Sequence, residues 1–97
     1  MPHEGWSWKR VTADTEIYSG PCVFAGVILA ADGVGTADVT IRDGRDTGGR
    51  QFATFRTPVS RTESHVLPAP AHFDGGIFVD VGSNVEEAVV LYQGVGQ

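Results

Sequence analysis

The sequence has few of the residues that stabilise small domains through disulfides or helices. Cys22 is the only cysteine, so no disulfide can form within one chain. One lysine and one methionine stand beside 13 glycines and five prolines, a composition that disfavours helices and favours short strands joined by turns. A chain of 97 residues makes one small domain with a limited core. We therefore expect neighbouring subunits to contribute to its burial.

Positive charge and long apolar runs are also scarce. Seven Lys and Arg residues stand against 12 Asp and Glu residues, which gives a net charge of −5. Nucleic-acid binding needs clustered Lys and Arg. No apolar run approaches the ~18–20 residues of a membrane span, and Met1–Gly5 lacks the basic and apolar regions of a signal peptide. The sequence predicts no nucleic-acid partner, no membrane association and no secretion signal.

The signatures of catalysis and cofactor binding are missing too. None of the three histidines, His3, His65 and His72, is spaced as a metal ligand from another His or Cys. There is no Gly-x-Ser-x-Gly elbow, and the glycines near residue 34 lack the third glycine of a dinucleotide fingerprint. Cys22 opens an apolar run and is expected to be a buried, inert thiol. We expect no enzyme, no cofactor and no metal.

What the sequence does contain is a succession of short alternating or apolar segments bounded by turn residues. This pattern predicts an all-β domain, an antiparallel β-sandwich or jelly-roll-like fold of about seven or eight short strands. An extended N-terminal arm (1–14) precedes the β-sandwich domain (15–93) and a C-terminal tail (94–97). The expected strands cover residues 15–19, 22–31, 36–43, 51–57, 61–67, 77–81 and 87–92.

Turn signals predict how three of these strands are joined or ended. Asp32-Gly33 is a dipeptide typical of tight hairpins, so strands 22–31 and 36–43 are expected to pair. Pro68-Ala69-Pro70 is expected to end the strand before it. Ser83-Asn84-Val85-Glu86 matches a helix capping box, but the adjacent valines that follow favour a strand, with room for one helical turn before it.

Several large side chains are candidates for contacts with other subunits. Trp6 and Trp8 are two residues apart in the arm, and they either cover this domain's own core or dock on a neighbour. The run 22–31 is apolar on both faces, with Phe24 and Ile28 expected on one face and Val27 and Leu29 on the other. The candidate interface residues are Trp6, Trp8, Phe24, Ile28, Arg45, Phe52 and Tyr92.

Phe52 and Phe55 present a conflict of spacing. Residues three apart in a regular strand point to opposite faces. Either one ring is exposed at an interface, or a β-bulge turns it inward.

Three segments carry a likeness to a known group of proteins. They are Gly26-Val27 within its apolar strand, residues 36–44 (TADVTIRDG), and residues 75–82 (GGIFVDVG) followed by 88–92 (AVVLY). Their order resembles that of small β-sandwich virion structural proteins of tailed bacteriophages, such as capsid decoration, cement or head-fibre proteins. The likeness covers residues 15–93.

The resemblance implies a structural role without catalytic residues. It points to a capsid decoration or cement protein that binds the outer surface of the major capsid protein shell, forms a homo-oligomer with a trimer favoured, and assembles in the host bacterial cytoplasm into the virion. Two alternatives stay open, a head–tail or tail-ring component of the virion and a carbohydrate-binding β-sandwich module. In the second, Trp6, Trp8 or Tyr92 would stack on sugar rings.

Overall fold

The computed structural model describes residues 6–94 and shows eight β-strands and no helix within them. The predicted all-β class is therefore confirmed. Within this range there is accordingly no helix long and apolar enough to cross a membrane. The strands are β1 (Ser7–Val11), β2 (Thr15–Ser19), β3 (Cys22–Ala31), β4 (Ala37–Asp43), β5 (Arg50–Thr57), β6 (Thr62–Phe73), β7 (Gly76–Val81) and β8 (Val85–Gly94).

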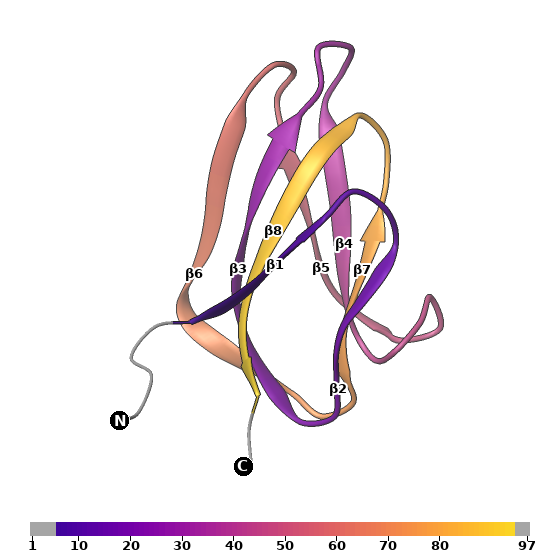
Figure 1. Cartoon of the computed structure of the whole chain (residues 1–97), viewed down its shortest axis with the longest axis vertical. Coiled ribbons are helices and arrows are strands. Elements are labelled where there is room, and N and C mark those ends of the chain that lie inside the picture. The colour runs from indigo at the N-terminus through magenta and orange to yellow at the C-terminus, as the bar shows by residue number, and fades with distance from the viewer. Residues whose placement is uncertain (1–5, 95–97) are drawn as a thin grey trace.

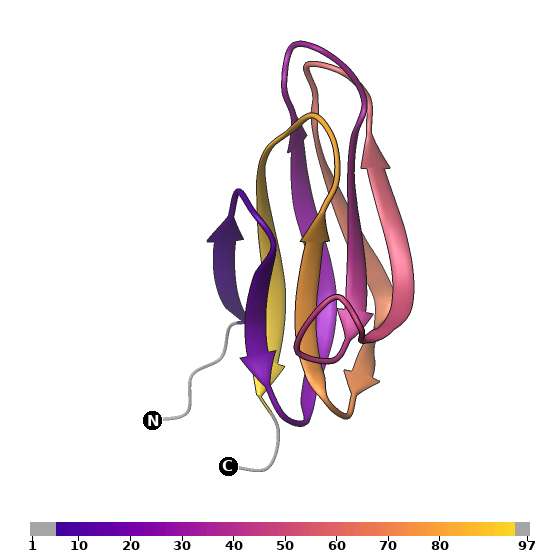
Figure 2. The same ribbon diagram turned by 90° about the vertical axis from the view of Figure 1, so that its right-hand side faces the viewer.

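The strands form two antiparallel sheets of four strands each, packed face to face (Figures 1 and 2). Sheet A has the order β1-β8-β3-β6, and sheet B has the order β2-β7-β4-β5. Figure 2 shows the edge strands β1 and β2 together at one side of the sandwich and β5 and β6 together at the other. This is the predicted β-sandwich, and each sheet has one face toward the core and one toward the outside.

Most connections carry the chain from one sheet to the other. Only β4 and β5 are both consecutive and paired within one sheet. The predicted hairpin across Asp32-Gly33 is therefore wrong, because β3 lies in sheet A and β4 in sheet B. The Asp32 carboxylate accepts hydrogen bonds from the backbone N–H groups of Val34 (2.8 Å) and Gly35 (3.3 Å). The backbone of Asp32 bonds to two other loops, at Asn84 (2.9 Å) and Ser60 (2.9 Å), so this turn is fixed against its neighbours.

The predicted arm is only partly separate from the sandwich. Residues 7–11 form β1, which pairs with β8 at the edge of sheet A. Val11 faces inward with 4% of its surface exposed, and this burial anchors the strand. Gly94 of the predicted tail is the last residue of β8. Residues 1–5 of the arm, with His3, and residues 95–97 of the tail lie outside the described residues.

A β-bulge in β3 changes which residues face the core. The pairing of β3 with both β6 and β8 shifts between Phe24 and Gly26, so Ala25 is the extra residue. The parity of the strand reverses there, and Phe24 lies on the same inner side as Val27 and Leu29, each with 0% exposure. The two faces predicted for this strand by simple alternation are therefore wrong beyond the bulge.

Gly26 is required at this bulge. Its φ is +155°, and a Cβ atom there would lie 2.6 Å from the carbonyl oxygen of His65 and 2.8 Å from the Cα of Val66. Because both atoms belong to the backbone of β6, no side chain can be accommodated without moving that strand.

The strand β6 runs through the prolines that were expected to end it. Val66 pairs with Gly26 and Ala71 pairs with Phe24, so the four residues 67–70 stand opposite Ala25 alone. Pro68 and Pro70 lie within this unpaired stretch of an edge strand, where no neighbouring strand needs a backbone N–H donor. The helical turn left open near residue 84 is not formed, since Asn84 has φ +59° in a turn and β8 begins at Val85.

Candidate functional site

The outer face of sheet A carries a row of apolar residues contributed by all four strands. In the strand register, Trp8 is opposite Leu91, Leu91 is opposite Gly26, and Gly26 is opposite Val66. Trp8 is 66% exposed and Val66 is 58% exposed. Gly26 within the row is buried, and the position that a Cβ atom would take there is occupied by the backbone of β6. Two exposed side chains, Trp8 and Val66, thus stand at the two ends of the row.

The neighbouring row extends this apolar surface along the strands. Val89 and Ile28 are opposite each other, with Arg10 at one end and Ser64 at the other. The guanidinium of Arg10 is paired with the carboxylate of Glu87 at 2.7 Å. We call the surface made by Trp8, Ile28, Val66, Val89 and Leu91 the apolar face. Its other members, Ile28, Val89 and Leu91, are half-buried.

The outer face of sheet B carries charged and hydroxyl side chains, and those of Thr40, Thr54, Arg42 and Asp80 bond to one another. The hydroxyls of Thr40 and Thr54 lie 3.0 Å apart. Arg42 donates to the carboxylate of Asp80 at 3.3 and 3.4 Å and to the carbonyl of Gly49 at 3.2 Å. These polar groups already have partners within the chain, so this face differs in kind from the apolar face.

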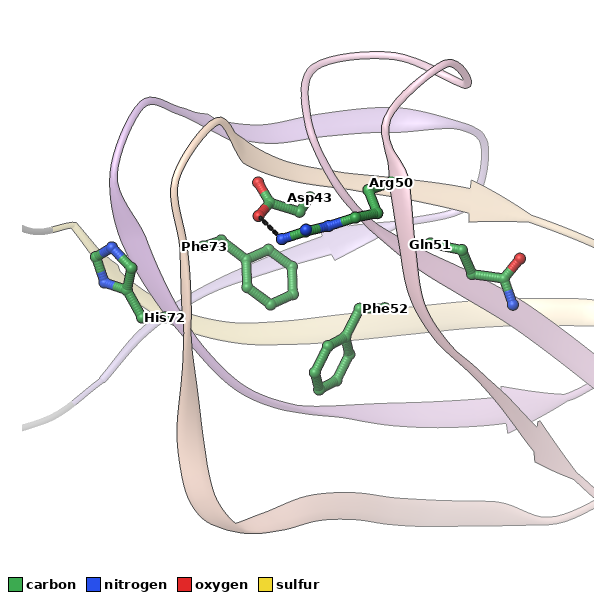
Figure 3. Close-up of a pocket in the computed structure, with 6 residues that line it drawn as sticks. All are labelled: Asp43, Arg50, Gln51, Phe52, His72 and Phe73. Atoms are coloured by element: carbon green, nitrogen blue, oxygen red, sulfur yellow. Dashed lines mark ion pairs between the residues drawn. The ribbon is translucent and has the colours of Figure 1, made fainter.

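A pocket of about 240 Å³ opens at the side of the sandwich where the edge strands β5 and β6 meet (Figure 3). The rings of Phe52 and Phe73, with centroids 5.2 Å apart, form its apolar wall. Asp43 and Arg50 lie above these rings with a nitrogen–oxygen distance of 3.5 Å, and Figure 3 shows His72 at one end and the Gln51 amide pointing away.

The carboxylate of Asp43 has a structural task in this pocket. It accepts hydrogen bonds from the backbone N–H groups of Gly75 (2.9 Å) and Asp74 (3.3 Å). These bonds fix the turn between β6 and β7 to the end of β4. Arg50, by contrast, has a side chain that is 82% exposed, and a surface ion pair of this kind contributes little to stability.

Cys22 is buried, as the sequence predicts, and its thiol has low reactivity. Its surface is 0% exposed. Burial, reinforced by the negative charge of Asp43, raises the pKa of the Cys22 thiol from 9.0 to about 11. At neutral pH the reactive thiolate is therefore depleted relative to an ordinary cysteine.

The structure separates the candidate interface residues that the sequence suggested. Trp8 and Ile28 lie on the apolar face, and Trp6, 39% exposed, precedes β1. The prediction for Phe24 is wrong, because the bulge at Ala25 places its ring in the core with 0% exposure. Trp8 does not cover the domain's own core, since it alternates with the inward-facing Val11 to the outside of β1.

Tyr92 and Arg45 lie away from the apolar face. Tyr92 is half-buried and packs against the core, with its ring 5.9 Å from that of Tyr18. Arg45 is in the loop between β4 and β5, where its exposed side chain lies 3.6 Å from the carboxylate of Glu16.

Phe52 is both bulged and exposed. The pairing of β4 and β5 shifts so that Ile41 faces Ala53 and Arg42 faces Gln51, which leaves Phe52 as the extra residue. The bulge turns its ring toward Phe24, at a centroid distance of 5.8 Å, yet 41% of the residue stays exposed. Of the two alternatives that the spacing of Phe52 and Phe55 left open, the bulge that turns the ring inward is thus the one observed, and a contact of the exposed part with another subunit stays a prediction.

The two described histidines have separate partners. His65 Nε2 lies 2.9 Å from the hydroxyl of Thr57, between β6 and β5. His72 Nε2 lies 3.1 Å from the carboxylate of Asp74. Across residues 6–94, no group of three His, Cys, Asp or Glu side chains is placed to hold a metal ion.

Three members of the apolar face, Val66, Val89 and Leu91, were missed by reasoning from the sequence. Each looks like an ordinary strand residue, and only the pairings of β8 with β1 and β3, and of β3 with β6, join them to Trp8. Comparison of the chain with protein-family models, with curated proteins and with solved structures finds no match.

Proposed function

We propose that this protein is a virion structural subunit, a capsid decoration or cement protein that assembles on the outer surface of a phage capsid. The observation that carries the proposal is the apolar face of sheet A, with Trp8 66% exposed at its edge. In the virion this face is buried against a neighbouring protein subunit. The resemblance of residues 15–93 to small virion β-sandwiches supports the choice of assembly.

The physical basis of this function is burial of apolar surface. Removing apolar area from water stabilises a contact by about 25 cal/mol per Å² before the costs of association are counted. Tryptophan is a common centre of such contacts, because its large ring loses little conformational entropy on binding. Many modest contacts repeated over a capsid lattice would brace the shell against the pressure of the packaged DNA.

Co-sedimentation with empty, expanded capsids purified from the parent phage tests the proposal. We expect the wild-type chain to pellet with capsids and a Trp8→Gln, Val66→Thr double variant to remain largely in the supernatant. Arg56→Gln, an exposed change on the outer face of sheet B, is the matched control and should bind like wild type. Absence of wild-type binding would overturn the proposal. Binding restricted to tail structures would favour the head–tail or tail-ring role.

A carbohydrate-binding module is the second candidate, and the exposure of Trp6 and Trp8 favours it. Neighbouring exposed tryptophans offer flat surfaces for stacking on sugar rings. Titration of tryptophan fluorescence with cello-, malto- and chito-oligosaccharides separates the two functions. Saturable quenching that Trp8→Gln abolishes supports the sugar-binding module, and a flat response to all three series rejects it for these sugars.

A further inference from the structure

We infer that the pocket between β5 and β6 is a binding site for a small aromatic carboxylate, either a free acid or the aromatic C-terminal residue of a peptide. The ring of the ligand lies on the rings of Phe52 and Phe73, and its carboxylate is bound by the guanidinium of Arg50. The pocket is lined by other residues than the apolar face of sheet A, so the inference is independent of the proposed assembly role.

The apolar wall of the pocket belongs to a cluster of three phenylalanine rings. The ring centroid of Phe24 lies 5.8 Å from that of Phe52 and 5.7 Å from that of Phe73. Phe24 and Phe73 are buried, whereas Phe52, the extra residue of the bulge in β5, is 41% exposed. The wall is therefore supported from behind by the core and reached from outside at Phe52. A ligand ring packs well on such a wall, because aromatic pairs are favourable at centroid distances of about 4.5–7 Å.

The strand register places a cation beside this wall. Asp43 is the last residue of β4, Arg50 is the first residue of β5, and the two are opposite each other in the pairing. Figure 3 shows their side chains extended toward each other above the ring of Phe73. The nitrogen–oxygen distance of 3.5 Å is longer than the ~2.7–2.9 Å of a charge-assisted hydrogen bond. Arg50 is thus positioned at the pocket but held loosely there.

The two charged groups of the pocket differ in their availability to a ligand. The carboxylate of Asp43 has 12% of its side chain exposed and already accepts hydrogen bonds from the backbone N–H groups of Gly75 and Asp74. The side chain of Arg50 is 82% exposed, and within residues 6–94 the one polar contact of its guanidinium is with Asp43. A guanidinium has five N–H donors and can bind a carboxylate through two of them. The pocket therefore offers donors to a ligand, which favours an anion over a cation.

The size of the pocket and the charge of its surroundings limit the ligand and its affinity. A volume of about 240 Å³ is below the ~300–1,000 Å³ of pockets that hold drug-sized molecules, so a single ring is the expected size. The nearby carboxylate of Asp74 and the net charge of −5 oppose the approach of an anion. We therefore expect a dissociation constant in the millimolar range for a single-ring acid.

Titration of the isotope-labelled full chain with phenylacetate, followed by two-dimensional NMR, tests the site. We expect saturable shifts of the backbone signals of residues 50–52 and 72–73. Arg50→Gln should weaken binding about tenfold, because it removes the charged donors while leaving an exposed position that contributes little to stability. Arg45→Gln is the matched control and should bind like wild type, since Arg45 is also an exposed arginine, 3.6 Å from the carboxylate of Glu16, and does not line the pocket.

Two further probes test the charge of the ligand. Phenylacetamide has a neutral amide in place of the carboxylate and should bind about tenfold more weakly than phenylacetate. Benzylammonium has the same ring with a positive charge and should bind more weakly still. Absence of saturable shifts with phenylacetate, equal affinity of Arg50→Gln and wild type, or tighter binding of benzylammonium than of phenylacetate would each overturn the inference.

A peptide identifies the source of the carboxylate. The tripeptide glycyl-glycyl-phenylalanine presents the same ring and carboxylate at the end of a chain. Tighter binding of the tripeptide than of phenylacetate would assign the pocket to the C-terminal residue of a partner, and the reverse order would assign it to a free acid. Equal binding of the tripeptide and its C-terminal amide would overturn the inference.

Discussion

The two outer faces of the sandwich have the same architecture and opposite chemistry. On sheet B the groups that face outward are bonded to one another, as in Thr40 with Thr54 and Arg42 with Asp80. On sheet A the outward row runs from Trp8 through Leu91 to Val66 and has no polar group to pair. The polar groups named on sheet B satisfy one another, whereas the apolar row of sheet A ends in the exposed side chains of Trp8 and Val66. The contact proposed for this protein rests on that apolar row.

The largest effect is expected from adding a side chain at Gly26 in the apolar row of sheet A. Gly26→Ala should lower the free energy of unfolding by about 3 kcal/mol, because its Cβ would collide with the backbone of β6 at a backbone angle that disfavours side chains. Urea unfolding followed by circular dichroism measures the loss. Gly33→Ala is the control, since the nearest atom there, Ser60 Oγ, is 3.9 Å away, and its change should be small. A loss below about 1 kcal/mol for Gly26→Ala would show that the bulge can relax.

The ionisation of Cys22 tests the buried face of β3 separately from its outer face. The folded-state pKa of Cys22, about 11, lies above its ordinary value of 9.0, so the unfolded chain loses this proton first as the pH rises. Stability is therefore fully present below pH 9.0 and falls by roughly 2 kcal/mol as the pH approaches 11.

Urea unfolding of wild type and Cys22→Ala across this pH window measures the effect. Any other effect of pH is common to both chains and cancels in the difference. The variant should be less stable than wild type at neutral pH, because it leaves a small cavity, and the gap should narrow at high pH. Parallel curves for the two proteins would refute the assignment to Cys22.

The smallest effect is expected on the outer face of sheet B. Arg42→Gln should cost about 1 kcal/mol, since it removes hydrogen bonds to Asp80 and to the Gly49 carbonyl at a half-buried position. Arg56→Gln on the same face is exposed and should change stability by less than about 0.5 kcal/mol. Chemical denaturation at low and high salt measures both. If the two variants lose equal stability, the hydrogen bonds of Arg42 do not stabilise the folded state.

Much of the fold was accessible from the sequence because turns and alternation are local signals. The strands Thr15–Ser19 and Cys22–Ala31 begin and end where the pattern placed them. The bulge at Ala25 was not accessible, because a change of register depends on two partner strands far away in the chain. One extra residue there moved Phe24 from a predicted interface into the core.

The candidate site was accessible only in part, for the same reason. Trp8 could be identified from the sequence because a large aromatic residue stands out from the polar segment around it. Ile28 could be identified because the run 22–31 is apolar on both faces. Leu91 and Val66 join them only through pairings that span most of the chain. Asp32-Gly33 gave a hairpin signal that was wrong, because the hydrogen bonds that hold this turn come from Ser60 and Asn84.

The central place of β8 in sheet A has a consequence for how the chain acquires its fold. The strand β8 lies between β1 and β3, so sheet A is not continuous until β8 is in place. On the ribosome, β1 therefore cannot pair with β8 until the six strands between them have been synthesised. Such long-range pairing makes folding slow relative to helical domains of this size. During that interval the edges of β1 and β3 are unpaired, and a crowded cell would offer them wrong partners.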